Sequence, residues 1–156
     1  MAFLCCKISE ILGRSRYDQF QKAYRLSDND IEKIVRLLPD LDILWVKGGE
    51  PFADDNNYKV LESLLKVNNK CKIHFTSNMS NIPQKYIDLC ADHRKQIIIG
   101  CSIDGIHDYY EYIRSSRFQK TIDNIIRWHE ETNILVSLGT SMSIYNLYGL
   151  EDMISY

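Results

Sequence analysis

The stretch that decides the fold is IIIGCSIDG, residues 97–105. Its three consecutive isoleucines, Ile97–Ile99, form a continuous apolar run, which predicts a strand buried on both faces. Small and polar residues, Ser102 and Asp104 among them, follow directly after this run. A buried strand with polar residues beyond its carboxyl end is typical of a parallel sheet covered by helices. The stretch therefore predicts an α/β protein.

The same alternation of strands and helices extends outward from this stretch in both directions. Further strands are predicted at Ile43–Val46, Cys71–Thr76 and Ile134–Leu138. Apolar periodicity predicts helices at Ser27–Leu38, Tyr58–Val67, a short segment opened by Pro83, Phe118–His129 and Leu147–Ile154. Repeated βα units predict a mainly parallel sheet. Because four units are too few to close an eight-stranded barrel, we expect an open sheet that lacks strands at one or both ends.

The composition is that of one cytoplasmic globular domain, residues 1–156. Apolar residues make up 45% of the chain, and 19 basic side chains stand against 21 acidic ones. This balance gives no reason to expect nucleic acid or an anionic membrane as a partner, and no apolar run approaches the roughly 18 residues that a membrane span needs. The five cysteines favour a reducing compartment over a disulfide framework, because they are scattered and odd in number: Cys5, Cys6, Cys71, Cys90 and Cys101.

Small or polar residues follow each predicted strand, at positions that a parallel sheet brings to one edge. They are Gly48–Pro51, Ser77 and Asn78, Ser102–Gly105, and Ser141–Ser143. Each has a plainer interpretation: the glycines as a turn, Ser77 and Asn78 as a helix cap, and Asp104 with Gly105 as a turn. Their recurrence after successive strands favours a ligand site, and the chain contains neither a Walker loop nor GxGxxG.

These residues resemble a known family. The sequence Gly48–Pro51 after one strand, together with Ser102–Gly105 after another, is similar to the radical S-adenosylmethionine (SAM) superfamily. The segments Asp108–Arg114 and Met142–Leu147 resemble its subgroup with a carboxyl-terminal twitch domain. The resemblance covers residues 26–156 and implies an open, partial radical SAM βα barrel. It also implies SAM as the cofactor, reductive cleavage of SAM, and an unknown substrate that we expect to be a peptide or protein.

The resemblance also implies roles for the predicted site residues. A zwitterionic methionine moiety needs an acceptor for its ammonium group and a cation for its carboxylate. Glu50 or nearby backbone carbonyls would take the ammonium group, and Arg114 would clamp the carboxylate, unless it is a surface arginine on a helix. Ser102 and Asp104 would accept from ribose hydroxyls. The full predicted SAM-binding set is Gly48, Gly49, Glu50, Pro51, Ser77, Asn78, Ser102, Asp104 and Arg114.

The resemblance fails at the iron–sulfur cluster. The family holds a [4Fe–4S] cluster through a CxxxCxxC loop, and this chain has no such motif. Residues 1–25 are expected to be a remnant that follows the cluster loop. Cys5 or Cys6 is then either the last cysteine of a truncated cluster motif or not a cluster ligand. Two functions are consistent with these observations. The first is a radical SAM enzyme, or a fragment of one, that is inactive as this chain alone. The second is a non-catalytic SAM-fold module that binds a ligand, or a partner subunit that supplies the missing strands.

Overall fold

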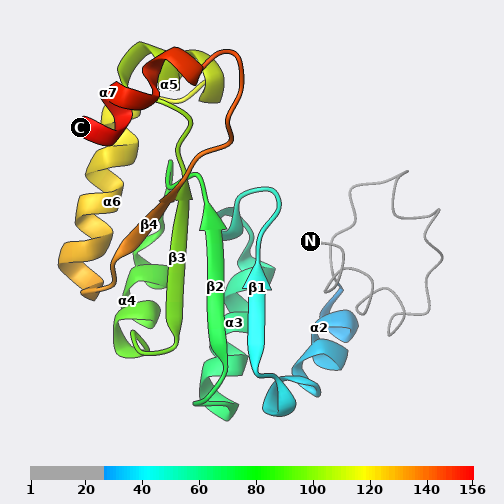
Figure 1. The fold of residues 1–156 in the computed structure, drawn as a ribbon. Coiled ribbons are helices and arrows are strands. Elements are labelled where there is room, and N and C mark those ends of the chain that lie inside the picture. Colours follow the sequence, from blue (N-terminus) through cyan, green and yellow to red (C-terminus); the bar gives the residue numbers. More distant parts are fainter. Residues whose placement is uncertain (1–26) are drawn as a thin grey trace, which may run out of the picture.

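The computed structural model describes residues 27–156, which contain an open parallel sheet of four strands. The strands are β1 (Ile43–Val46), β2 (Lys72–Ser77), β3 (Ile97–Ser102) and β4 (Val136–Gly139). They lie in the order β1-β2-β3-β4, and every neighbouring pair is parallel. All four therefore point toward the same edge of the sheet (Figure 1). The predicted α/β class and open parallel sheet are confirmed.

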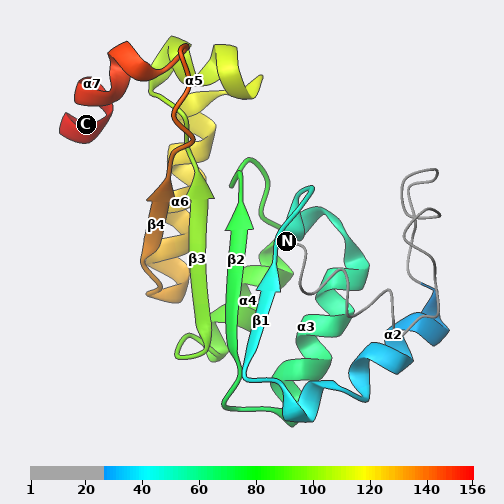
Figure 2. The same ribbon diagram turned by 45° about the vertical axis from the view of Figure 1, so that its right-hand side comes forward.

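Helices cover one face of this sheet, as Figures 1 and 2 show. They are α3 (Asp55–Val67), α4 (Gln84–Asp92) and α6 (Phe118–Thr132), while α2 (Asp28–Val35) packs beside α3. Beyond the carboxyl ends of the strands lie α5 (His107–Arg114) and α7 (Leu150–Ser155). A doubly wound sheet reverses its strand order and carries helices on both faces. Sequential order with helices on one face is instead the arrangement of a barrel wall.

The prediction that the strand Ile97–Ile99 is buried on both faces is wrong. Ile97 and Ile99 are buried under the helices, whereas Ile98 is 44% exposed on the opposite face. Trp45 of β1 is 49% exposed on that face for the same reason. An apolar run supplies apolar side chains to both faces of the sheet, but among residues 27–156 no element covers this second face.

Several predicted element bounds also change. The first helix ends at Val35, and Leu38 falls in the short 3-10 turn η1 (Leu38–Asp40), because Pro39 disfavours helical backbone at the residue before it. The last strand begins at Val136 instead of Ile134, after Asn133 has ended α6 in a left-handed conformation. The final helix begins as the 3-10 turn η3 (Leu147–Gly149) and becomes α7 only at Leu150. Helix α5 was expected only in the alternative that placed Arg114 on a helix.

An aromatic cluster forms the centre of the core between the sheet and the helices. Phe52, in the 3-10 turn η2 (Pro51–Ala53), contacts Phe75 of β2, Tyr86 of α4 and Trp128 of α6, with ring centroids 5.3, 5.0 and 5.6 Å away. Phe52 is 2% exposed, and Tyr86 and Trp128 are fully buried. Within residues 27–156, no helix has the length and apolar character needed to cross a membrane.

Candidate functional site at the carboxyl edge of the sheet

The predicted site segments lie together at the carboxyl edge of the sheet, as expected. Each follows the end of one of four parallel strands (Figure 1). Two hydrogen-bonded groups form there. One joins the loop after β1 to the end of β2, and the other joins the end of β3 to α5 and to the loop after β4.

Glu50 is the centre of the first group. Its Oε1 accepts from the Ser77 hydroxyl at 2.6 Å, and its Oε2 accepts from the Asn78 backbone N–H at 3.0 Å. The Phe52 backbone N–H makes a longer contact of 3.5 Å with Oε1. These donors fix the carboxylate at the rim, where it is half-buried. Glu50, Ser77 and Asn78 therefore form one unit, which the sequence showed only as two separate segments.

The loop that carries Glu50 is shaped by its glycines and anchored by its next turn. Gly48 and Gly49 have φ values of 97° and 61°, in the region that side chains disfavour. A Cβ at Gly49 would meet nothing within 4 Å, so the space beside its backbone is open. Below it, Pro51 and Phe52 are buried, and the Pro51 carbonyl accepts from the Asn57 side chain at 2.9 Å. The glycine loop thus presents open backbone on a rigid base.

Asp104 is the centre of the second group. Its Oδ2 lies 2.6 Å from Nη2 of Arg114, and its Oδ1 accepts from the Ser141 backbone N–H at 2.8 Å. Asp104 is 6% exposed and the Arg114 side chain 28%. A charged pair with this much burial holds its partners firmly, because removing either one leaves the other charge unpaired. The pair therefore ties β3, the end of α5 and the loop after β4 together.

The loop after β4 is held in place by buried polar contacts. Thr140 donates its hydroxyl to the Ile103 carbonyl at 2.6 Å, and Asn146, 1% exposed, donates to the Ser141 carbonyl at 2.9 Å. The Asn146 side-chain oxygen accepts from the Ser143 backbone N–H at 2.8 Å. Asn146 was not predicted as a site residue, although an asparagine three residues after a serine is a recognisable turn signal.

The described residues offer groups that suit SAM. Oε2 of Glu50 accepts one hydrogen bond, from the Asn78 backbone N–H, and retains a lone pair for an ammonium group. Nε of Arg114 is buried and has no hydrogen-bond partner among residues 27–156, whereas the Arg114 side chain as a whole is 28% exposed. Ser102 ends β3 in register with Gly139, on the face away from the helices. Asp104 and Arg114 are paired with each other in the structure. Their predicted roles, with the ribose for Asp104 and the SAM carboxylate for Arg114, stay predictions.

The described cysteines do not fit a [4Fe–4S] cluster. Burial raises the pKa of Cys90 and of Cys101 to about 12 and also raises that of Cys71, so all three favour the neutral thiol over the thiolate ligand. No group of three metal-ligating side chains forms anywhere in residues 27–156. Cys5 and Cys6, and the predicted remnant at residues 1–25, lie outside the described residues.

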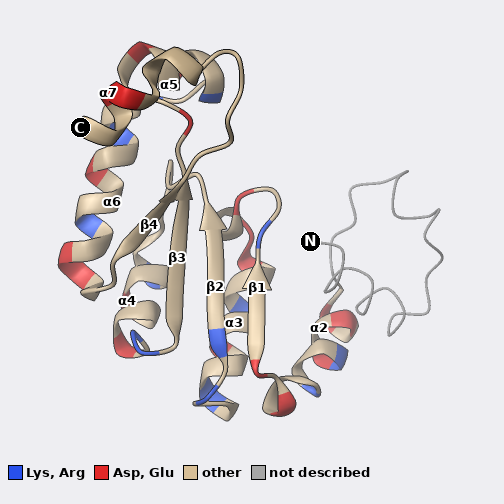
Figure 3. Cartoon of the chain, viewed as in Figure 1, with Lys and Arg blue, Asp and Glu red and all other residues tan. Residues whose placement is uncertain are grey.

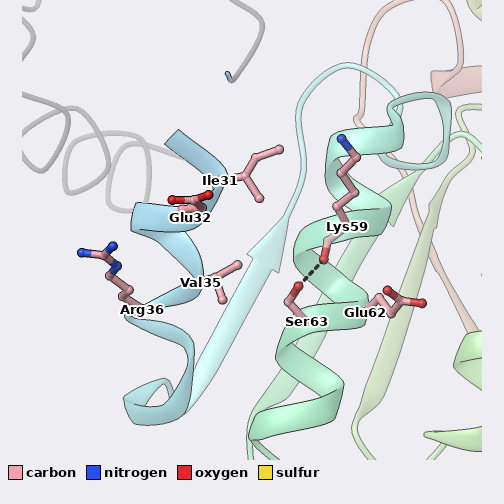
Figure 4. A pocket seen from close by; sticks show the side chains of 7 residues that line it. All are labelled: Ile31, Glu32, Val35, Arg36, Lys59, Glu62 and Ser63. Carbon is pink, nitrogen blue, oxygen red and sulfur yellow. Dashed lines mark hydrogen bonds between the residues drawn. The ribbon is translucent and has the colours of Figure 1, made fainter. Parts of the chain in front are cut away.

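The remaining surface features lie away from this edge. The strands are largely uncharged, and most Lys, Arg, Asp and Glu residues lie on helices and loops (Figure 3). A groove of about 550 Å³ lies between α2 and α3, where Ile31 and Val35 face α3 (Figure 4). Its rim carries side chains of both charges, and none of the predicted SAM-binding residues lines it.

The sequence profile of the radical SAM superfamily matches residues 5–152. Similar solved structures include native anSMEcpe with bound AdoMet (SAM), and the same protein with AdoMet and either the Cp18Cys or the Kp18Cys peptide. Their TM-score is 0.62 in each case, at 13%, 14% and 15% sequence identity. They cover 90%, 85% and 90% of this chain, which spans only 43%, 42% and 44% of theirs. At these identities the likeness shows the fold alone. No curated protein matches the chain.

Proposed function

Because the chain belongs to the radical SAM superfamily, as the match over residues 5–152 shows, we propose that its carboxyl edge binds SAM. We further propose that it is the SAM-binding part of an enzyme that cleaves SAM reductively to modify a peptide or protein. The observation that carries the proposal is the fixed Glu50 carboxylate beside the open backbone of Gly49. The peptides bound to the neighbouring structures, and the resemblance of residues 108–114 and 142–147 to the twitch-bearing subgroup, support this substrate class and lineage.

In this proposal each group of the site binds or orients one part of SAM. Glu50 accepts from the ammonium group through the free lone pair of Oε2, while Ser77 and Asn78 hold the carboxylate in position. Ser102 and Asp104 accept from ribose hydroxyls, while the Asp104–Arg114 pair orders the loop at Ser141 and presents the partly exposed Arg114 guanidinium to the SAM carboxylate. The cluster expected of the family supplies the electron for cleavage. Residues 27–156 do not fit it, so this chain alone is proposed to bind SAM without cleaving it.

The test compares SAM with 5′-deoxyadenosine, which lacks the amino acid moiety, by ligand-observed NMR on the full chain. A few net hydrogen bonds of about 1 kcal/mol each, set against the cost of ordering the ligand, place both dissociation constants at roughly millimolar to high micromolar. Glu50→Gln should weaken SAM and spare 5′-deoxyadenosine. Asp104→Asn should weaken both ligands, because both carry the ribose.

The matched control is Glu62→Gln on α3, which lines the groove of Figure 4 and should change neither affinity. Ser77→Ala keeps the charge of Glu50 but removes its 2.6 Å hydrogen bond, so it should weaken SAM less than Glu50→Gln does. Equal effects of Glu50→Gln on the two ligands would contradict the assigned role of this carboxylate.

A specific observation favours the alternative, a non-catalytic module that binds a partner subunit. Among the described residues, β1 and β4 are each paired on one side only, and apolar side chains in and next to β4 are strongly exposed, with Leu135 at 79% and Leu138 at 60%. An unpaired edge beside apolar side chains is a template for an added strand. If neither ligand binds the folded chain at millimolar concentration, this alternative replaces SAM binding.

A further inference from the structure

The face of the sheet opposite the helices carries an ordered set of side chains, of which the proposed SAM binding uses only Ser102. We call it the open face. Strand register arranges it in rows, since side chains of alternate residues point to the same side. The residues of the open face are Ile43, Trp45, Lys47, Lys72, His74, Thr76, Ile98, Gly100, Ser102 and Ser137.

One row of the open face is an aromatic and apolar floor. Trp45 and His74 are register partners on β1 and β2, and their rings stack with centroids 4.5 Å apart and 13° between planes. Ile98 lies beside His74 on β3. Trp45 remains 49% exposed and Ile98 44% exposed, although both lie in the body of the sheet. Because the Trp45 and His74 rings are stacked on each other, a flat aromatic group would contact their exposed ring edges together with Ile98.

The next row, closer to the carboxyl edge, is polar and contains the cation Lys47. Lys47 holds its Nζ 5.4 Å from the centre of the Trp45 ring. No ion pair joins it to an Asp or Glu within residues 27–156. Thr76, Gly100 and Ser137 continue this row across the sheet, and Gly100 leaves a gap in it because it has no side chain. A cation beside an exposed ring selects an anion attached to a flat group.

We propose that the open face binds an aromatic ring that carries a carboxylate, with the ring on Trp45, His74 and Ile98 and the carboxylate facing Lys47. In a peptide substrate this group is an aromatic carboxyl-terminal residue. The inference rests on the proposed function only in identifying this ligand as the substrate. Within residues 27–156, the hydrogen bonds and the ion pair of the Glu50 and Asp104 groups involve neither the floor nor Lys47. The site lies on the same sheet, next to Gly48 and Gly49 at the carboxyl edge.

The test uses tryptophan fluorescence of the full chain with acrylamide as quencher. The chain has two tryptophans, and Trp128 is fully buried, so quenching reports on Trp45. N-acetylphenylalanine should protect Trp45 from acrylamide and bind about fivefold more tightly than its uncharged amide, the size of a partly exposed ion pair. N-acetylalanine, which has the carboxylate but no ring, should give no protection.

Lys47→Gln should abolish the preference for the acid over the amide, whereas Lys72→Gln, at the far end of the same face, should preserve it. Trp45→Leu should abolish binding of N-acetylphenylalanine by ligand-observed NMR, in a variant shown to be folded by circular dichroism. Equal protection by acid and amide, or unchanged binding to Trp45→Leu, overturns the inference. Because SAM is titrated in parallel and Lys47→Gln should leave its affinity unchanged, a failure of SAM binding is distinguished from a failure of this site.

Discussion

At the scale of single residues, one buried asparagine holds the amino edge of the sheet together. The Asn68 Nδ2 group donates to the carbonyls of Leu38 and Leu41 at 2.9 and 2.8 Å, and its Oδ1 accepts from the Cys71 backbone N–H at 3.0 Å. Gln96 completes the network by donating to the Asn68 carbonyl at 3.0 Å. These bonds join the turn before β1 to the starts of β2 and β3. Asn68 therefore helps to align the strands, and this alignment positions their ends at the carboxyl edge.

We expect Asn68→Leu to lower the free energy of unfolding by about 3 kcal/mol, because each buried group left without a partner costs about 1–3 kcal/mol. Urea denaturation followed by circular dichroism measures the loss. Asn69→Leu is the matched control: Asn69 is exposed, and substitutions at such positions usually stay within about 0.5 kcal/mol. Similar losses in both variants would show that the network does not determine stability.

At the same scale, the sequence identified most site residues but not their partners. Glu50 and Asp104 were recognised because each follows a strand, and that position depends only on local sequence. The bonds from Ser77 to Glu50 and from Arg114 to Asp104 join residues 27 and 10 positions apart, and they exist only once β2 and α5 are placed. Pairing of this kind is a property of the tertiary fold, and apolar periodicity does not predict which residues will pair.

At the scale of secondary structure, helix ends decide where strands begin. Helix α6 ends at Thr132 and is capped by Asn133, which has a φ of 55° and whose backbone N–H donates to the His129 carbonyl at 2.8 Å. This left-handed residue turns the chain toward β4, which is why the strand begins two residues later than the apolar run predicts. Periodicity finds the body of an element, whereas its ends depend on caps that one residue can shift.

Asn133→Gly should raise the free energy of unfolding by about 0.5 kcal/mol, because glycine adopts this conformation without the steric cost that a side chain imposes. Asn69→Gly serves as the control. Asn69 is also exposed, but its φ is not positive, so glycine there should lower stability by a similar amount. Urea denaturation of both variants checks the pair, and a loss of stability in Asn133→Gly would contradict this account of the turn.

At the scale of the whole molecule, two faces of one sheet have different chemistry. The helix side is a closed apolar core centred on Phe52, while the open face exposes Trp45 and Ile98. The structure therefore separates stability from binding: the core fixes the loop of Glu50 from below, and the exposed side and rim are free for ligands. The sequence predicted the sheet and its order of elements, but not which face lacks a cover, because apolar residues occupy both.

The distribution of cysteines over the whole fold leads to the last prediction. Cys71 precedes β2 at the amino edge, whereas Cys101 lies near the end of β3. Because Ile73 pairs with Ile97, the level of Cys101 is about six residues further along the strands, or roughly 20 Å at 3.3 Å per residue. Thiolates must converge to hold a cluster, so these cysteines cannot share one.

Reconstituted without oxygen from iron and sulfide, the full chain should therefore hold no stable [4Fe–4S] cluster. Cys5 and Cys6 supply at most two thiolates, and burial raises the pKa of Cys71, Cys90 and Cys101, which keeps each of them a neutral thiol instead of a third ligand. Iron analysis and the charge-transfer absorbance of the purified chain measure this. About four irons per chain, as such a cluster contains, would contradict the prediction, and Cys5→Ala and Cys6→Ala would then locate its ligands. If iron is absent while SAM still binds, recognition of SAM resides in the carboxyl edge described above. Cleavage would then require thiolates that residues 27–156 do not provide.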